Sequence, residues 1–165
     1  MHYLSKEQEQ EMKTWMDEAA RVAKQATCTR ARCGSVIVSD GQVIGSGFNS
    51  PPGDDEGQRR CVVPKDTYDK KVTDKTCCVH AEQRAVMSAL RNRPDRVAGS
   101  IMYFIRLDGE GNVRASSSLH KPYCTICSKM VLDAGIAQFV LMQEEGLCSY
   151  ETGEYNKISF SYANS

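Results

Sequence analysis

Apolar residues near the N-terminus recur at the three- and four-residue spacing of an amphipathic helix. The series includes Met12 and Trp15 and continues to about Ala26. Ser5 and Gln8 precede it in the arrangement of a capping box, in which each residue satisfies a free backbone group at the helix start. The pattern predicts a first helix whose apolar face, including the Trp, lies in the core rather than in a ligand site.

Two β-rich runs follow, Ser35–Ser39 and Gln42–Phe48, and only Asp40 and Gly41 separate them. Asp-Gly favours the tight turn of an antiparallel hairpin, so we expect the two runs to pair. The chain then leaves the sheet at Asn49. The next stretch, 54–76, has little periodicity and is too long for an idle loop, so we interpret it as an inserted, functional loop.

The rest of the chain alternates between helical and extended patterns. We expect a helix over Val79–Arg91, a strand over Ser100–Arg106, a short return strand over Val113–Ser116, a helix over Cys124–Asp133 and a strand over Ala137–Met142. The first of these helices should bury Leu90. Residues 146–165 are expected as a C-terminal extension that adds a short helix or strand. This order predicts an α/β fold, one domain over residues 1–165 with helices on both faces of a sheet.

Composition narrows the function. The chain has 165 residues, 41% of them hydrophobic, which suits one globular domain. Its 21 basic and 21 acidic residues cancel, which favours a small-molecule substrate over nucleic acid. No apolar run approaches the roughly 20 residues of a membrane span, and no secretory leader pattern is present, so we expect a cytoplasmic protein with no membrane association. The eight cysteines then indicate metal binding rather than disulfides.

The chemistry concentrates in two short motifs, His80-Ala81-Glu82 and Cys124-Thr125-Ile126-Cys127. His80, Cys124 and Cys127 are three zinc ligands, and a catalytic zinc site leaves its fourth position for water. Glu82 can then move protons for that water. The alternative is a closed structural site in which a further cysteine such as Cys78 completes the ligands and Glu82 lies on a helix surface.

The H-x-E and C-x-x-C motifs resemble those of zinc-dependent nucleobase deaminases. The chain is similar to the cytidine and deoxycytidylate deaminase superfamily through segments in this order: Cys28-Thr29-Arg30, Gly34–Val38, Gly47-Phe48-Asn49, His80–Ala85 and Cys124–Gly135. The resemblance implies a three-layer α/β/α domain with a mixed sheet of about five strands, and a homo-oligomer. It also implies zinc held by His80, Cys124 and Cys127, with Glu82 as the catalytic acid and base.

The same resemblance suggests substrate contacts. Asn49 belongs to a segment similar to the family's G-Y-N-x-x-P loop, and Ala81 lies between the ligand and the acid. Tyr123 stands where the family usually has Pro, which marks a change in the pocket wall. Arg30 is the first candidate for a substrate phosphate, because guanidinium matches phosphate oxygens. From the residues alone, Asn49 can equally form a turn, and Arg30 can be an ordinary surface residue, as can Arg59 and Arg60.

The inserted loop makes the chain most like the deoxycytidylate (dCMP) deaminase branch. In that reading Cys28, Cys61 and Cys77 or Cys78 hold a second, structural zinc, unless they are simply small buried side chains. We therefore expect hydrolysis of dCMP to dUMP and ammonia. An acidic turn at Gln143-Glu144-Glu145 argues against a phosphate, so a nucleoside, a free base or a tRNA base stays open as substrate, as does a non-catalytic zinc-stabilised binding module.

Overall fold

The computed structural model describes residues 1–115 and 124–160. The helices and strands in chain order are β1 (His2–Tyr3), α1 (Lys6–Ala23), β2 (Arg32–Ser39), β3 (Gln42–Phe48), α2 (Ala81–Asn92), β4 (Ile101–Leu107), α3 (Thr125–Asp133), β5 (Gln138–Gln143), β6 (Gly146–Glu151) and α4 (Thr152–Ser159). None of the helices in this part of the chain is both long and apolar enough to cross a membrane.

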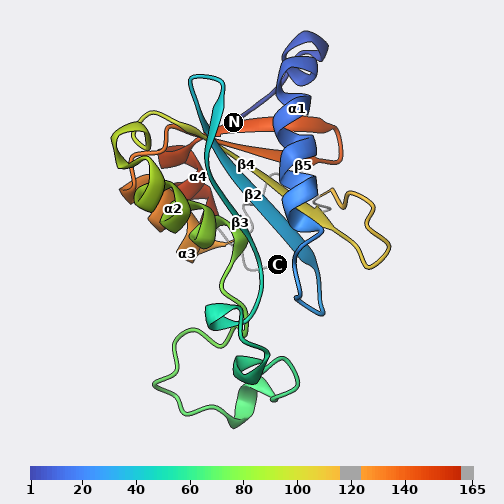
Figure 1. Ribbon diagram of the computed structural model, residues 1–165, viewed down its shortest axis with the longest axis vertical. Coiled ribbons are helices and arrows are strands. Elements are labelled where there is room, and N and C mark those ends of the chain that lie inside the picture. The colour runs from blue at the N-terminus through green and yellow to red at the C-terminus, as the bar shows by residue number, and fades with distance from the viewer. Residues whose placement is uncertain (116–123, 161–165) are drawn as a thin grey trace.

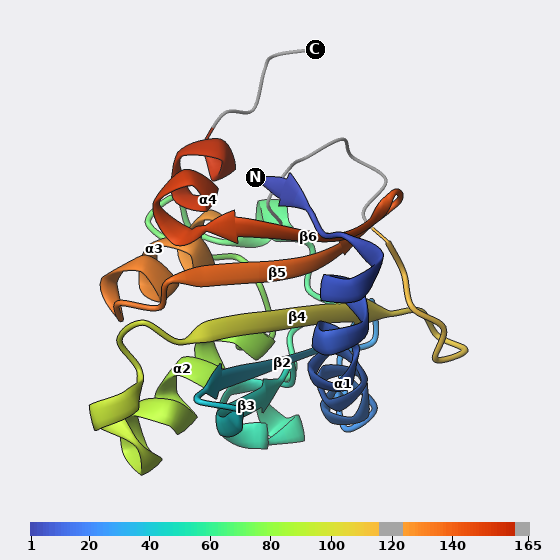
Figure 2. The same cartoon turned by 90° about the horizontal axis from the view of Figure 1, so that it is seen from above.

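The six strands form one mixed sheet in the order β1-β6-β5-β4-β2-β3, which Figure 2 shows side by side. Strands β4 and β5 pair in parallel, and every other pair is antiparallel. The predicted α/β class and mixed sheet are confirmed, with six strands instead of about five. The segment expected as a C-terminal extension supplies β6 and α4, and the two-residue β1 pairs with β6 at the sheet edge.

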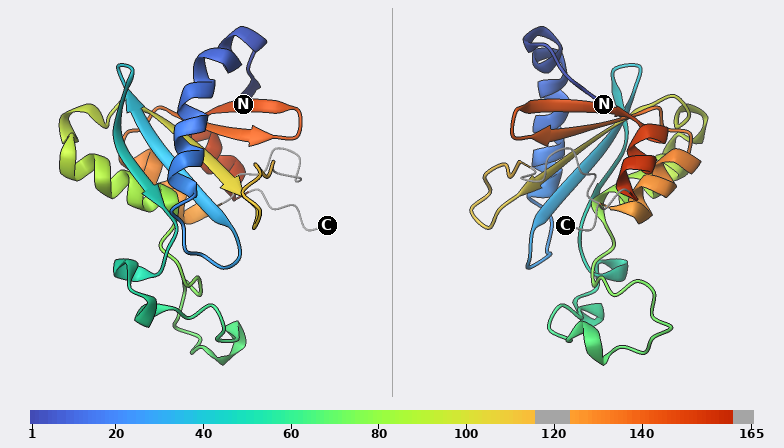
Figure 3. Two further views of the ribbon diagram at one scale, coloured as in Figure 1. Left: turned by 45° about the vertical axis from the view of Figure 1, so that its right-hand side comes forward. Right: turned by 180° about the vertical axis from the view of Figure 1, so that it is seen from behind.

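Helices cover both faces of the sheet, as predicted. Helix α1 lies on one face, and α2, α3 and α4 lie on the other (Figures 1 and 3). Each face has its own apolar core, because successive residues of a strand point to opposite sides. Val36 and Tyr103 pack towards α1, whereas Ile37 and Met102 pack towards α2 and α3. Tyr155 of α4 stacks on Phe139 with ring centroids 4.3 Å apart.

Local rules explain the first elements. The Ser5 hydroxyl accepts a hydrogen bond from the Gln8 backbone N–H, and the Gln8 side chain accepts one from the Ser5 N–H, so the predicted capping box is present. Helix α1 ends at Ala23, three residues before the expected end. In the β2–β3 hairpin both Asp40 and Gly41 have positive φ, as the tight Asp-Gly turn requires.

The close approach of α2 to β3 places the start of α2 over the sheet. A Cβ atom on Gly47 would lie 2.4 Å from the backbone oxygen of Ala81, and one on Gly45 would lie 2.5 Å from that of Ala85. Only glycine permits helix and strand backbones to pack this tightly. The bridge between Ser50 and Val79 then fixes the segment that enters α2.

Two details of the sequence prediction are wrong or incomplete. Leu90 is 48% exposed instead of buried, because α2 turns that side chain away from the sheet. Of the expected return strand, the structure shows one bridge between Leu107 and Val113, and Ser116 lies outside the described residues.

The inserted segment 54–76 extends away from the sheet (Figures 1 and 3). It contains short 3₁₀ turns, and none of its residues is buried. The segment therefore has no apolar core of its own. Polar contacts hold it in place, and some of them involve cysteine sulfur atoms.

Candidate active site

Two helix starts bring the three predicted ligands together. His80 is the N-cap of α2, Cys124 is the N-cap of α3, and Cys127 lies in the first turn of α3. Their ligand atoms all lie within 4.8 Å of one another, and His80 Nδ1 is 3.3 Å from Cys127 Sγ. One imidazole nitrogen and two sulfurs are a donor set that zinc accepts, with bonds of about 2.0–2.3 Å. The residues present therefore fit a zinc ion.

Hydrogen bonds among the three donors shift their pKa values. A hydrogen bond with Cys127 lowers the pKa of Cys124 to about 4, while the same hydrogen bond, together with burial, raises the pKa of Cys127. The hydrogen bond with Cys124 raises the pKa of His80 to about 9. Zinc binds the deprotonated forms of these donors, so metal binding at the triad is coupled to proton release.

Glu82 lies beside these three residues, in the first turn of α2. It is the second residue of α2 and only 3% exposed, and burial raises the pKa of its carboxyl group. The alternative in which Glu82 lies on a helix surface is therefore wrong. Cys78, the proposed fourth ligand of a closed site, groups with other cysteines instead of with the triad.

A cavity of about 230 Å³, which we call the Glu82 cavity, opens beside these residues. Its walls include His80, Glu82 and Cys124, together with the predicted substrate contacts Arg30, Asn49 and Ala81. The remaining predicted contact, Tyr123, lies outside the described residues. The structure thus gathers three of the four predicted substrate contacts at one cavity.

The Asn49 side chain forms two hydrogen bonds to the backbone at this cavity. Its Oδ1 accepts a hydrogen bond of 2.8 Å from the Cys33 backbone N–H, and its Nδ2 donates one of 3.0 Å to the Ala31 oxygen. These bonds join the end of β3 to the chain that enters β2. Both bonds are long-range, so the role they show for Asn49 is a link between two segments and not a local turn. A contact between Asn49 and substrate stays a prediction.

Sequence reasoning missed four residues of the Glu82 cavity: Ala31, Cys33, Phe104 and Arg106. Cys33 and Arg106 face each other across the β2–β4 pair. Burial and then the charge of Glu82 raise the pKa of Cys33 to about 12. Arg106 Nε is buried without a hydrogen-bond partner among the described residues. Phe104 and Arg106 are two positions apart in β4 and so lie on one face of the sheet. This alternation could have predicted that the two side chains reach the same cavity.

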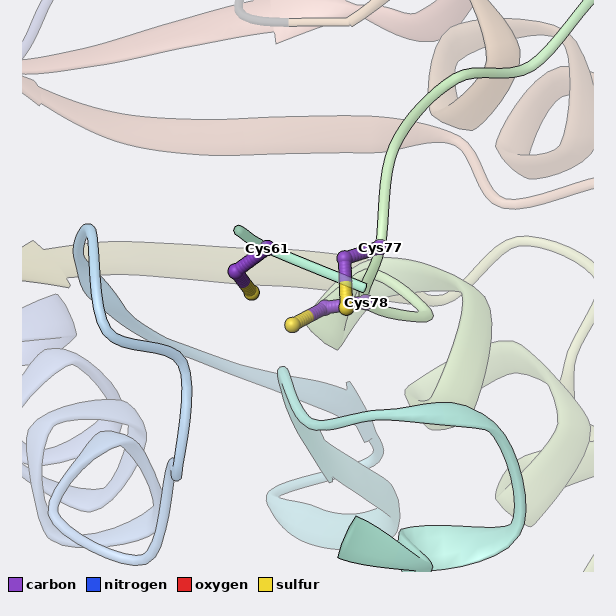
Figure 4. A group of neighbouring side chains, drawn as sticks. All are labelled: Cys61, Cys77 and Cys78. Atoms are coloured by element: carbon purple, nitrogen blue, oxygen red, sulfur yellow. The ribbon is translucent and has the colours of Figure 1, made fainter. Parts of the chain in front are cut away.

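A second cluster lies at the base of the inserted segment. The sulfurs of Cys61, Cys77 and Cys78 lie within 4.8 Å of one another and point to a common centre (Figure 4). Cys28 is outside this group of three but adjoins Cys78: burial, and then a hydrogen bond with Cys28, raise the pKa of Cys78. All four cysteines of the predicted second zinc site are thus neighbours.

Backbone and side-chain donors surround this cluster. The Arg60 N–H donates a hydrogen bond of 3.0 Å to Cys77 Sγ, and Arg59 Nη1 donates one of 3.7 Å to Cys61 Sγ. Arg59 also pairs with Glu56 at 2.5 Å and bonds the Thr27 oxygen. Its guanidinium is therefore occupied here, which removes Arg59 as a phosphate candidate.

Comparison with known proteins agrees with this geometry. Residues 9–143 match the family model of the cytidine and deoxycytidylate deaminase zinc-binding region. The deoxycytidylate deaminase of Mycobacterium phage D29 is 26% identical over 132 residues, which cover 76% of this chain and 89% of the phage protein. That of Schizosaccharomyces pombe is 32% identical over 84 residues, 48% of this chain and 26% of the yeast protein.

A solved structure shares the fold. The dCMP deaminase of cyanophage S-TIM5, crystallised with dCMP and dUMP, superposes with a TM-score of 0.55 at 20% identity, covering 83% of this chain and 82% of the cyanophage chain. The chain spans only about a quarter of the yeast relative but most of the two phage proteins. The family model covers both motifs and strands β2 to β5, which are four of the six strands. This chain therefore belongs to the cytidine and deoxycytidylate deaminase zinc-binding family.

Proposed function

We propose that the protein is a zinc-dependent hydrolase that converts dCMP to dUMP and ammonia. The observation that carries the proposal is the meeting of His80, Cys124 and Cys127 beside the buried Glu82, at one cavity, in a chain of this family. The two relatives from phage D29 and Schizosaccharomyces pombe, both deoxycytidylate deaminases, support this choice of substrate.

In this proposal His80, Cys124 and Cys127 hold the zinc ion. When bound, zinc supplies the Lewis acidity that makes water a usable nucleophile near neutral pH. Glu82 accepts a proton from the attacking water and returns it to the departing amine, so that the carbon exchanges its C–N bond for a C–O bond and ammonia leaves. Burial suits Glu82 to this work, because a raised pKa lets its carboxyl group hold a proton more readily than an exposed glutamate does.

The acidic turn after β5 does not oppose a phosphorylated substrate. Neither Glu144 nor Glu145 lines the Glu82 cavity or the cavity of about 150 Å³ that adjoins it. Both lie near Tyr3 instead, where burial and then the charges of Glu145 and Glu144 raise the tyrosine pKa. The sequence-based objection to a nucleotide substrate therefore weakens.

A substrate screen tests the proposal. The purified zinc-loaded protein should release ammonia fastest from dCMP when cytosine, adenine and guanine are each offered as base, nucleoside and monophosphate. A preference for adenine or guanine would support the purine alternative. Release of ammonia from none of them, in protein with full zinc content, would support the non-catalytic module.

We also propose that Cys28, Cys61, Cys77 and Cys78 hold a second zinc ion with a structural role. Four thiolates are a common ligand set of structural zinc. The N–H groups of Arg59 and Arg60 aimed at Cys61 and Cys77 suit thiolate sulfur. Such an ion would cross-link the loop after α1, the inserted segment and the start of α2. It would supply the anchor that the segment lacks in apolar packing.

Metal analysis distinguishes one zinc from two. The wild-type protein should contain two zinc ions per chain, and the double variant Cys61→Ser/Cys77→Ser should contain one. Cys148→Ala is the matched control, since Cys148 is a buried cysteine of β6 outside both clusters, and it should keep two. One zinc per chain in fully loaded wild-type protein contradicts the second site.

Two further expectations stay predictions. Exposed apolar side chains on α2 and α3, Met87, Leu90 and Leu132, support the proposed homo-oligomer. A cytoplasmic location rests on the sequence alone.

A further inference from the structure

A second cavity, of about 150 Å³, lies on the inserted-segment side of the Glu82 cavity. We call it the basic cavity. Both cavities have Cys28, Arg30, Asn49 and His80 in their walls. The two cavities therefore adjoin each other at these residues.

The basic cavity carries an excess of positive charge. Arg30, Arg60, Lys65 and Lys75 line it, and no Asp or Glu does. None of these four cations takes part in an ion pair within residues 1–115 and 124–160. Positive charges that converge on a concave wall without a carboxylate favour an anion.

Contacts within the segment hold these cations at the cavity, and the hydrogen bonds that do so go to uncharged oxygens. Lys75 Nζ donates a hydrogen bond of 3.0 Å to the Lys65 backbone oxygen, which joins the two lysines across ten residues of chain. The Arg60 guanidinium binds the backbone and side-chain oxygens of Gln58, both neutral. Asp74, the carboxylate beside Lys75 in sequence, accepts hydrogen bonds from the Thr76 N–H and hydroxyl. Partial burial opposes ionisation of the Asp74 carboxyl group, but these bonds, and then the charges of His80 and Lys65, outweigh it and lower the pKa of that group.

The cysteine cluster fixes the position of Lys65 and Lys75. Cys61 and Cys77 bracket the stretch that carries Lys65 and Lys75, and both sulfurs belong to the cluster in the same cavity wall. The Arg60 N–H bond to Cys77 Sγ closes the loop at its base. The segment is thus held at both ends against the cavity that adjoins Glu82.

We infer that the inserted segment supplies the subsite for the substrate's 5′-phosphate, with Lys65 and Lys75 as its main contacts and Arg30 at the junction of the two cavities. The inference rests on the proposed function. The base lies in the Glu82 cavity and the phosphate dianion in the basic cavity. Each lysine offers a point charge and up to three donors to phosphate oxygens.

The double variant Lys65→Ala/Lys75→Ala tests the subsite. Its kcat/KM for dCMP should fall by about 10–100-fold, because two charge-assisted contacts are lost. Its kcat/KM for deoxycytidine, which has no phosphate, should stay within about twofold of wild type. Lys70→Ala/Lys71→Ala is the matched control, since it removes two lysines of the same segment that do not line the cavity. It should leave both substrates unaffected.

Inorganic phosphate provides a readout that needs no turnover. By calorimetry it should bind the wild-type and control proteins and not the Lys65→Ala/Lys75→Ala variant. It should also raise the KM of wild type for dCMP without changing that for deoxycytidine.

The outcomes separate the two proposals. Equal losses with dCMP and deoxycytidine, or no loss with either, overturn the phosphate subsite. If wild type turns over neither substrate, the proposed function fails. In that case calorimetry still decides the site: phosphate binding that depends on Lys65 and Lys75 supports it, and absence of binding overturns it.

Discussion

Replacing Glu82 with glutamine is expected to lower kcat for dCMP by about 10²–10⁴-fold, the usual contribution of a positioned acid and base. Glutamine keeps the size of the side chain but cannot carry the proton from water to the leaving amine. Glu82 is not one of the three clustered ligands, so the zinc content should stay at the wild-type level. Steady-state ammonia release measures kcat, and metal analysis of the same preparation measures the zinc content.

Stability supplies the control for this variant. Burial raises the pKa of Glu82 in the folded protein, so the folded state binds its proton more tightly than the unfolded chain does. The ionised carboxylate therefore destabilises the fold as pH rises above the ordinary glutamate pKa of about 4.3. Metal-free Glu82→Gln should unfold at a higher temperature than metal-free wild type at pH 7, and the difference should vanish near pH 4. Unchanged ammonia release from every substrate would falsify the role given to Glu82.

Replacing Cys124 with serine is expected to remove the zinc of the active site and to lower activity by at least about 10³-fold. The estimate follows because Lewis-acid stabilisation amounts to several kcal/mol and each 1.36 kcal/mol is tenfold in rate. Cys124 is the donor best prepared for the metal, since its hydrogen bond with Cys127 lowers its pKa to about 4. Zinc content and ammonia release should fall together.

Chelation gives the reversible form of the same experiment. Wild type stripped of metal should lose its activity and regain it on addition of zinc. Binding displaces protons from the donor set, so the apparent zinc affinity should fall as pH is lowered. Cys148→Ala should behave as wild type throughout. An active Cys124→Ser protein with no bound metal would show that the site works by other chemistry.

Local patterns account for the elements that sequence predicted well. The capping box of α1 and the Asp-Gly turn depend on residues within four positions of one another, so their geometry follows from backbone sterics and nearby hydrogen bonds. The spacing of Cys124 and Cys127 works in the same way. Two residues three apart at a helix start lie on one side whatever surrounds them.

Features that depend on contacts between distant parts of the chain were harder to predict from the sequence. Leu90 fits the helical period but faces away from the sheet, because the direction of α2 is set by its packing on Gly45 and Gly47. The sixth strand was missed because a two-residue strand such as β1 has no periodicity to detect. It exists only through its pairing with β6.

The sequence by itself determined the kind of chemistry: the types of metal ligand, the carboxylate two residues from His80, and the surplus of cysteines near the inserted segment. Only the tertiary structure decided that His80 meets Cys127 across 47 residues, that Glu82 is buried beside them, and that Lys65 and Lys75 line a cavity next to the one that holds Glu82. Residue types and short spacings are local properties. Burial, pKa and the meeting of distant side chains depend on how the sheet and helices pack, and one sequence does not specify that packing by any short-range rule.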